Sequence, residues 1–248
     1  MNIDLLKALC ETPGVPGHEE RVRDLIKAEI AGLFDEVHED AMGSLHCVRN
    51  GKGKSPKRIM LLCHMDEIGF LVSHVSEKGF IYLQTVGGFD PRNLFSRRFL
   101  VCTDDGDFKG EMNPGGPPVH ISSAEDRKNV PEPHQFFVDI GMGEKTRDVV
   151  SVGDMVVMDE PLIEIGEKVV SKALDNRIAC WLGIEAIRGL GKSRGDAEIH
   201  VAFTSQEEVG LRGARTASFA VRPDIGIGID TTLACDTPGV SEQDRTTE

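Results

Sequence analysis

Two adjacent carboxylates, Glu207 and Glu208, follow directly after an apolar run at residues 197–203. The first half of that run alternates apolar and polar side chains, as a β-strand does, and the residues after Glu208 indicate a turn into a helix. Open α/β sheets bind their ligands beyond the carboxyl ends of the strands. At such an edge one carboxylate can bind a metal ion while its neighbour transfers a proton. An isolated Glu-Glu pair is more often a solvated acidic turn, so the interpretation depends on other strand ends.

Three further sites in the chain place similar side chains in the same setting. His64 and Asp66 follow a short apolar run, Asp175 precedes a helical stretch, and Asp230 closes a short strand. An imidazole can bind a metal through one nitrogen while its other N–H donates to a carboxylate two residues on. Taken singly, each residue is more often a helix cap, a buried histidine or a turn residue. Taken together with Glu208, they supply the ligand types that a pair of divalent ions needs.

The periodicity of apolar residues indicates which elements position these side chains. Helical spacing occurs at residues 3–11 and 19–33, and residues 37–49 are typical of a β-hairpin. From about residue 71 to residue 162, short β-type runs punctuated by Gly, Pro and Asp predict a small barrel or sandwich. Helices and strands alternate again from residue 169 onward, as in a doubly wound sheet.

These patterns predict an α/β fold, with a doubly wound mixed sheet that carries helices on both faces and is interrupted by a small β-barrel domain. We expect a discontinuous domain at residues 1–70 and 163–248 and an inserted barrel domain at residues 71–162. Such an insertion would let His64 and Asp175 share a metal. The acidic stretch at 104–107 lacks the Gly and Glu of a calcium-binding EF-hand loop, so it indicates a hairpin turn.

Composition narrows the class of partner and the compartment. A net charge of −13 argues against nucleic acid or an anionic membrane as the main partner. No charged-then-apolar leader is evident at the N-terminus, and no apolar run approaches the roughly 20 residues of a membrane span. The six cysteines include no Cys-X-X-Cys pair, and several lie in apolar runs. We therefore expect a cytoplasmic protein without a membrane or nucleic-acid partner.

Ordered stretches along the whole chain resemble the TET, or glutamyl (leucyl) aminopeptidase, family of co-catalytic metallopeptidases, whose members have often been labelled endoglucanases. The stretches are ETPGVPGHE (11–19), CHMDEIGF (63–70), GGFDPR (87–92), GGPPVH (115–120), ALDNR (173–177) and QEEVGLRGA (206–214).

The resemblance implies a role for each candidate residue. His64, Asp175 and Asp230 would bind one metal, and Asp175 would bridge to a second metal that Glu208 also binds. Glu207 would be the general base and acid, and Asp66 would orient His64. The resemblance also implies a cis peptide bond between Asp175 and Asn176. Zinc or cobalt suits this mixture of imidazole and carboxylate ligands.

The chain departs from the family pattern in one respect. In the family the second metal has a further histidine ligand well beyond the position of Asp230, whereas the last histidine here is His200. We therefore expect a C-terminally truncated member in which the second of two divalent metal sites is incomplete.

The activity implied is removal of N-terminal residues from short peptides by water that two metals activate. The full-length protein is expected to be a homo-oligomer built from dimers through the barrel domain. A related metal-dependent amidohydrolase, acting as a deacylase or dipeptidase, and a catalytically impaired metal-binding fragment remain alternatives. An endoglucanase would need paired carboxylates in a sugar cleft but no metal.

Overall fold

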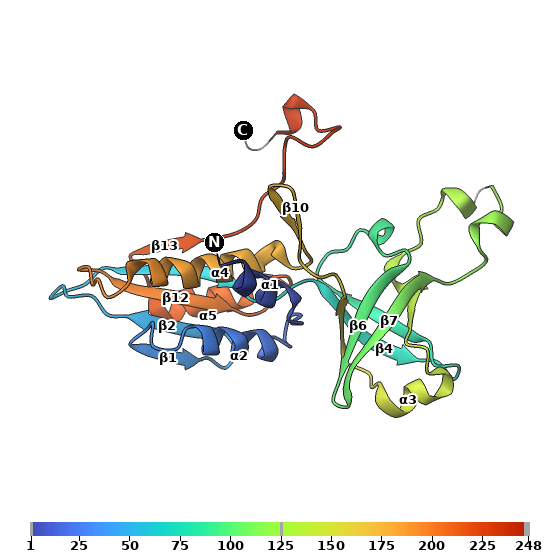
Figure 1. Ribbon diagram of the computed structural model, residues 1–248, viewed down its shortest axis with the longest axis horizontal. Helices are drawn as coiled ribbons and strands as arrows, with labels where there is room; N and C mark the ends of the chain where they lie inside the picture. The colour runs from blue at the N-terminus through green and yellow to red at the C-terminus, as the bar shows by residue number, and fades with distance from the viewer. Residues whose placement is uncertain (1, 125, 246–248) are drawn as a thin grey trace.

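The computed structural model describes residues 2–124 and 126–245, and its main sheet contains five strands (Figure 1). In spatial order they are β1 (Glu36–Glu39), β2 (Leu45–Arg49), β12 (Glu198–Thr204), β3 (Arg58–His64) and β13 (Ile225–Gly228). Strands β12 and β13 run parallel to β3 on its two sides, whereas β2 is antiparallel to β12 and β1 is antiparallel to β2. The sheet is therefore mixed, as the sequence predicts.

Helices pack on both faces of this sheet because alternate side chains of its central strands point in opposite directions. Leu61 and Cys63 of β3 belong to a core shared with α1 (Ile3–Glu11), α2 (Glu20–Glu29) and α4 (Leu174–Leu190). Met60 and Leu62 point to the other face, where they form a smaller core with α5 (Arg212–Val221). The predicted arrangement of helices on both faces is confirmed.

Six strands form a closed barrel to one side of the main sheet (Figure 1). They are β4 (Gly69–Val75), β5 (Ile81–Val86), β8 (Phe136–Asp139), β7 (Gly106–Pro114), β6 (Arg97–Thr103) and β9 (Met155–Met158), in that spatial order. Buried aromatic side chains, including Phe70, Phe99 and Phe136, fill its interior. Helix α3 (Thr146–Val149) follows β8, and a hairpin of β10 (Ile163–Ile165) and β11 (Lys168–Val170) leads back to α4.

The structure confirms the fold class, and it adds detail that the sequence patterns did not give. Asp104 and Asp105 form the turn between β6 and β7, as expected, and Gly106 and Asp107 begin β7, but β4 and β7 had not been identified as separate strands. The second helix ends at Glu29, before Gly32, rather than at residue 33. The limits of the two domains at residues 70/71 and 162/163 stay a prediction. No helix among residues 2–124 and 126–245 is long and apolar enough to span a membrane.

Gly213 allows the start of α5 to pack against the loop after β12. The Gly213 amide donates to the Ser205 carbonyl at 3.0 Å, and a Cβ atom at position 213 would lie only 2.4 Å from the same oxygen. We expect Gly213→Ala to lower the free energy of unfolding by about 1–3 kcal/mol, because the backbone must shift to relieve this contact. Urea unfolding of the metal-free protein measures the change.

Gly189→Ala is the matched control, since this glycine lies within α4 and a Cβ there has no atom within 4 Å. The higher helix propensity of alanine should raise the stability of that variant by roughly 0.5–1 kcal/mol. Similar unfolding midpoints for the two variants would contradict the packing argument.

Candidate metal centre

The carboxyl ends of three adjacent parallel strands bring the predicted residues to one edge of the sheet. His64 is the last residue of β3, Glu207 and Glu208 follow β12, and Asp230 follows β13. Asp175 reaches the same edge from the start of α4, although it lies 111 residues from His64 along the chain. Edges of this kind are where open α/β sheets bind ligands.

The Nε2 atom of His64 faces this group of carboxylates. It lies 3.2 Å from Asp175 Oδ1, 3.9 Å from Glu207 Oε2 and 4.0 Å from Asp230 Oδ1. Two sets of residues each offer potential ligand atoms, and within each set these atoms lie within 4.8 Å of one another. One set is His64, Asp175 and Asp230, and the other is His64, Glu207 and Glu208. The first set is the trio that the family resemblance implies for one metal, whereas the second groups Glu208 with Glu207 rather than with Asp175.

Asp66 contacts both the histidine and the turn that carries the two glutamates. His64 Nδ1 lies 3.0 Å from the backbone carbonyl oxygen of Asp66 and 3.4 Å from its carboxylate, so the carbonyl accepts the shorter bond. The fully buried carboxylate instead accepts the amide N–H groups of Glu207 and Glu208, each at 3.0 Å. The sequence suggested only the contact with His64; the bond to the turn was missed because backbone amides leave no signal in a sequence.

The electrostatics of the site indicate an excess of negative charge. Burial lowers the pKa of His64, but hydrogen bonds to Asp175 and Asp66 outweigh this effect and raise the pKa to about 10. Burial raises the pKa of Glu208 to about 7, and the nearby charge of Asp175 adds to the increase. Burial also raises the pKa of Glu207, whereas the hydrogen bond from His64 lowers the pKa of Asp175.

This donor set fits a divalent cation. Within the part of the chain that the structure describes, no lysine or arginine pairs with Asp175, Glu207, Glu208 or Asp230. When protonated, the imidazole of His64 is therefore the cation that pairs with Asp175, Glu207 and Asp230. A bound metal would replace that proton, and imidazole and carboxylate are ligands that zinc and similar metals accept.

Comparison with known proteins agrees with this geometry. The sequence profile of the M42 glutamyl aminopeptidase family matches residues 43–247. The chain belongs to this family.

Similar M42 proteins include the lysyl aminopeptidase of Pyrococcus furiosus, which is 33% identical over 93% of this chain and 66% of its own length. The TET aminopeptidase of a marine sediment Thaumarchaeota archaeon superimposes with a TM-score of 0.89 at 33% identity, over 96% of this chain and 67% of that one. The Pyrococcus horikoshii TET1 peptidase, described as assembling into a tetrahedron or a large octahedral shell, gives a TM-score of 0.84 at 31% identity, over 96% and 72%. This chain thus spans about two thirds of the length of these M42 relatives.

Membership of M42 places the chain among metal-dependent aminopeptidases and disfavours the deacylase or dipeptidase alternative. The cis peptide bond expected between Asp175 and Asn176 is present. Asn176, which the sequence reasoning did not single out, lies beside the site: its Nδ2 donates to Asp230 Oδ1 at 3.0 Å and to the Ile229 carbonyl at 2.7 Å.

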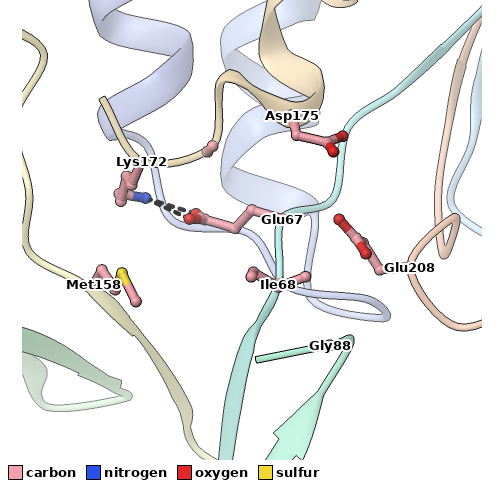
Figure 2. A pocket seen from close by; sticks show the side chains of 8 residues that line it. Glu67, Ile68, Gly88, Met158, Lys172, Asp175 and Glu208 are labelled. Carbon is pink, nitrogen blue, oxygen red and sulfur yellow. Dashed lines mark hydrogen bonds and ion pairs between the residues drawn. The ribbon is translucent and has the colours of Figure 1, made fainter. Parts of the chain in front are cut away.

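Two further acidic residues next to the M42 site were also missed. Buried Glu19 accepts the amide of Gln206 at 2.9 Å, immediately before the glutamate pair. Glu67, one residue after Asp66, lines a pocket of about 340 Å³ together with Asp175, Glu208 and Lys172 (Figure 2). Both residues lie inside stretches that carry the family resemblance, which was the available signal.

Because Asp66 accepts hydrogen bonds from two backbone amides, we expect its substitution to lower the stability measurably. Asp66→Asn leaves one acceptor oxygen, so its amide group must face one of the two N–H groups and leave it unpaired. We expect the free energy of unfolding of the metal-free protein to fall by about 1–3 kcal/mol. Hydrogen exchange at the Glu207 and Glu208 amides should accelerate, and urea unfolding gives the energy.

Asp154→Asn is the control, because its carboxylate accepts the Ser151 amide at an exposed turn. It should change stability by no more than about 0.5 kcal/mol. Unaltered exchange at residues 207 and 208 in Asp66→Asn would exclude the proposed anchoring of the turn.

Proposed function

We propose that this chain carries the active site of a metal-dependent aminopeptidase that removes N-terminal residues from short peptides. The convergence of His64, Asp175, Glu207, Glu208 and Asp230 at one sheet edge is the observation that supports it. The proposal assigns His64, Asp175 and Asp230 to one divalent ion, and it assigns Glu208 to a second ion bridged by Asp175. Zinc and cobalt are the ions proposed.

Glu207 is the proposed general base and acid. Its carboxylate is partly exposed, and burial raises its pKa, which suits a group that must accept and return a proton near neutral pH. Bound divalent ions supply Lewis acidity, which lowers the pKa of water and polarises the scissile carbonyl. Glu207 would take the proton of the attacking water and then protonate the leaving amine. The hydrogen bonds from the backbone amides of residues 207 and 208 to Asp66 would hold Glu207 in place for both proton transfers.

The pocket beside the metal centre suits the first residue of a peptide. Ile68 and Met158 provide apolar walls, and two of the candidate metal ligands, Asp175 and Glu208, also line the pocket (Figure 2). A free α-amine is positively charged or metal-binding, so it would be attracted to the same carboxylates that bind the ions. This arrangement favours cleavage at a peptide terminus over cleavage within a chain.

Substitution of each glutamate separates the two proposed roles. Glu207→Gln should lower kcat by about 10²–10⁴-fold with an unchanged metal content, because the amide keeps the shape but cannot accept a proton. Glu208→Gln should lose metal first. Hydrolysis of a leucyl or glutamyl anilide by the full-length protein with added zinc or cobalt measures the rate, and elemental analysis after dialysis measures the metal.

The matched pair also shows how the proposal could fail. Hydrolysis by Glu207→Gln at the unsubstituted rate would exclude a proton-transfer role. Equal loss of metal from both variants would show that Glu207 is itself a ligand. The second ligand set, which contains Glu207 with His64 and Glu208, is why this outcome is tested.

A homo-oligomer built from dimers through the barrel is the proposed assembly, and the cytoplasm is the proposed compartment. Exposed apolar side chains on barrel loops, among them Ile121 and Val152, support a contact surface there. Five buried cysteines form no disulfide, which suits a reducing compartment: Cys10, Cys47, Cys63, Cys102 and Cys180. Sedimentation of the full-length protein should give a multiple of a dimer, and deletion of residues 71–162 should give monomers. An assembly that survives the deletion would exclude the barrel as the contact.

A further inference from the structure

A buried carboxylate next to the metal centre has two cationic partners. The Glu67 side chain is 4% exposed, and its two oxygens accept Lys172 Nζ at 2.6 and 2.9 Å (Figure 2). Arg177 Nη2 lies 3.5 Å from Glu67 Oε1, and this arginine is completely buried. One carboxylate therefore binds two cations from a different part of the chain.

The two cations flank Asp175 in the sequence. Lys172 lies in the loop between β11 and α4, and Arg177 lies in the first turn of α4. Arg177 also donates to the Thr12 carbonyl at 2.8 Å and to the Gly14 carbonyl at 3.2 Å. The segment that carries Asp175 thus contacts Glu67, in the loop that follows β3, through a residue on each side of Asp175.

The position of Asp175 depends on the backbone that carries it as well as on the contact with His64 and the hydrogen bonds of the adjacent Asn176. Its side chain is 57% exposed, so close packing does not fix its position. The backbone around it is irregular: Ala173 has a left-handed φ of 55°, and Asp175 and Asn176 depart from helical angles within α4. A non-glycine residue in the left-handed region persists only where neighbouring contacts enforce it.

Stability alone is a weak explanation for this buried triad. Removing ions from water is costly, and well-packed apolar residues of similar volume often stabilise a protein as much or more. The Lys172 side chain is 6% exposed and that of Arg177 is not exposed at all, so both ions bear that cost in full. What these hydrogen bonds provide and apolar contacts do not is a specific partner, since the Lys172 loop can take only positions that keep Nζ within hydrogen-bond reach of the Glu67 oxygens.

We infer that Glu67 is a positioning residue for the metal centre: through Lys172 and Arg177 it fixes the backbone that presents Asp175 to the metal. The inference rests on the proposed function only through the assignment of Asp175 as a ligand. Glu67 itself needs no contact with the metal or the substrate.

Lys172→Met tests the inference, because methionine keeps most of the side-chain volume and removes the charge. Zinc affinity of the full 248-residue chain is measured by competition with a chromophoric chelator, without any substrate. We expect the affinity to fall about 10–100-fold, as is usual when a residue that supports a metal ligand is removed. The visible absorption of the cobalt-loaded protein should change as well, since it reports ligand geometry.

Arg188→Met is the matched control on the same helix. Arg188 pairs with Glu29 at 2.6 Å and with Glu185 at 2.7 Å, and it lies near the far end of α4 from Asp175. This variant loses an ion pair of similar length, so it shares any general effect on the helix. Its zinc affinity and cobalt spectrum should match those of the unsubstituted chain.

Unchanged zinc affinity in folded Lys172→Met would overturn the inference, and so would an equal loss in Arg188→Met. If Lys172→Met does not fold, the double variant Glu67→Gln/Lys172→Met removes both charges together, and the same titration decides. Absence of zinc binding by the unsubstituted chain would overturn the metal centre and this inference with it. Absence of peptide hydrolysis alone would overturn the proposed function and leave the titration result valid.

Discussion

Mutual repulsion among carboxylates is the constraint on which the rest of the site depends. Asp175, Glu207, Glu208 and Asp230 gather around one histidine, whose Nε2 lies 3.2–4.0 Å from three of them. Like charges at this spacing raise one another's pKa values or move apart unless a cation or a rigid frame holds them. The frame here consists of parallel strands whose ends are fixed by the sheet and of backbone amides that bind buried carboxylates.

The barrel affects this site through its connections. Strand β3 ends at His64, and the chain enters β4 only five residues later, at Gly69. The chain leaves the barrel through β9 and returns past the β10–β11 hairpin to α4, where Asp175 lies. Both connections pass the pocket, because Ile68 lines it from the first and Lys172 lines it from the second, and Met158 lines it from the end of β9 (Figure 2). The inserted barrel is therefore joined to the site at both of its ends.

Much of this arrangement could be predicted from the sequence, and the rest could not for definable reasons. Apolar periodicity predicted the sheet and placed candidate ligands at its strand ends, and the family resemblance implied that His64, Asp175 and Asp230 would meet. Strand β7 escaped detection, since Gly106–Pro114 carries charged and turn-forming residues on an exposed barrel strand. The hydrogen bonds from the Glu207 and Glu208 amides to Asp66 could not be predicted either, because a residue's type does not reveal which group its backbone N–H contacts.

Asp66 and Glu67 show how neighbouring carboxylates in one loop acquire different tasks. Their side chains point in different directions: Asp66 binds the turn after β12, and Glu67 binds the cations on either side of Asp175. The loop after β3, which begins next to His64, therefore contacts two of the three other segments that carry candidate ligands, whereas Asp230 is contacted by Asn176. A displacement of this loop would move the imidazole, the glutamate pair and Asp175 together. Within the frame of the sheet, the positions of His64, the glutamate pair and Asp175 relative to one another thus depend on one short segment, as a centre made from distant parts of a chain requires.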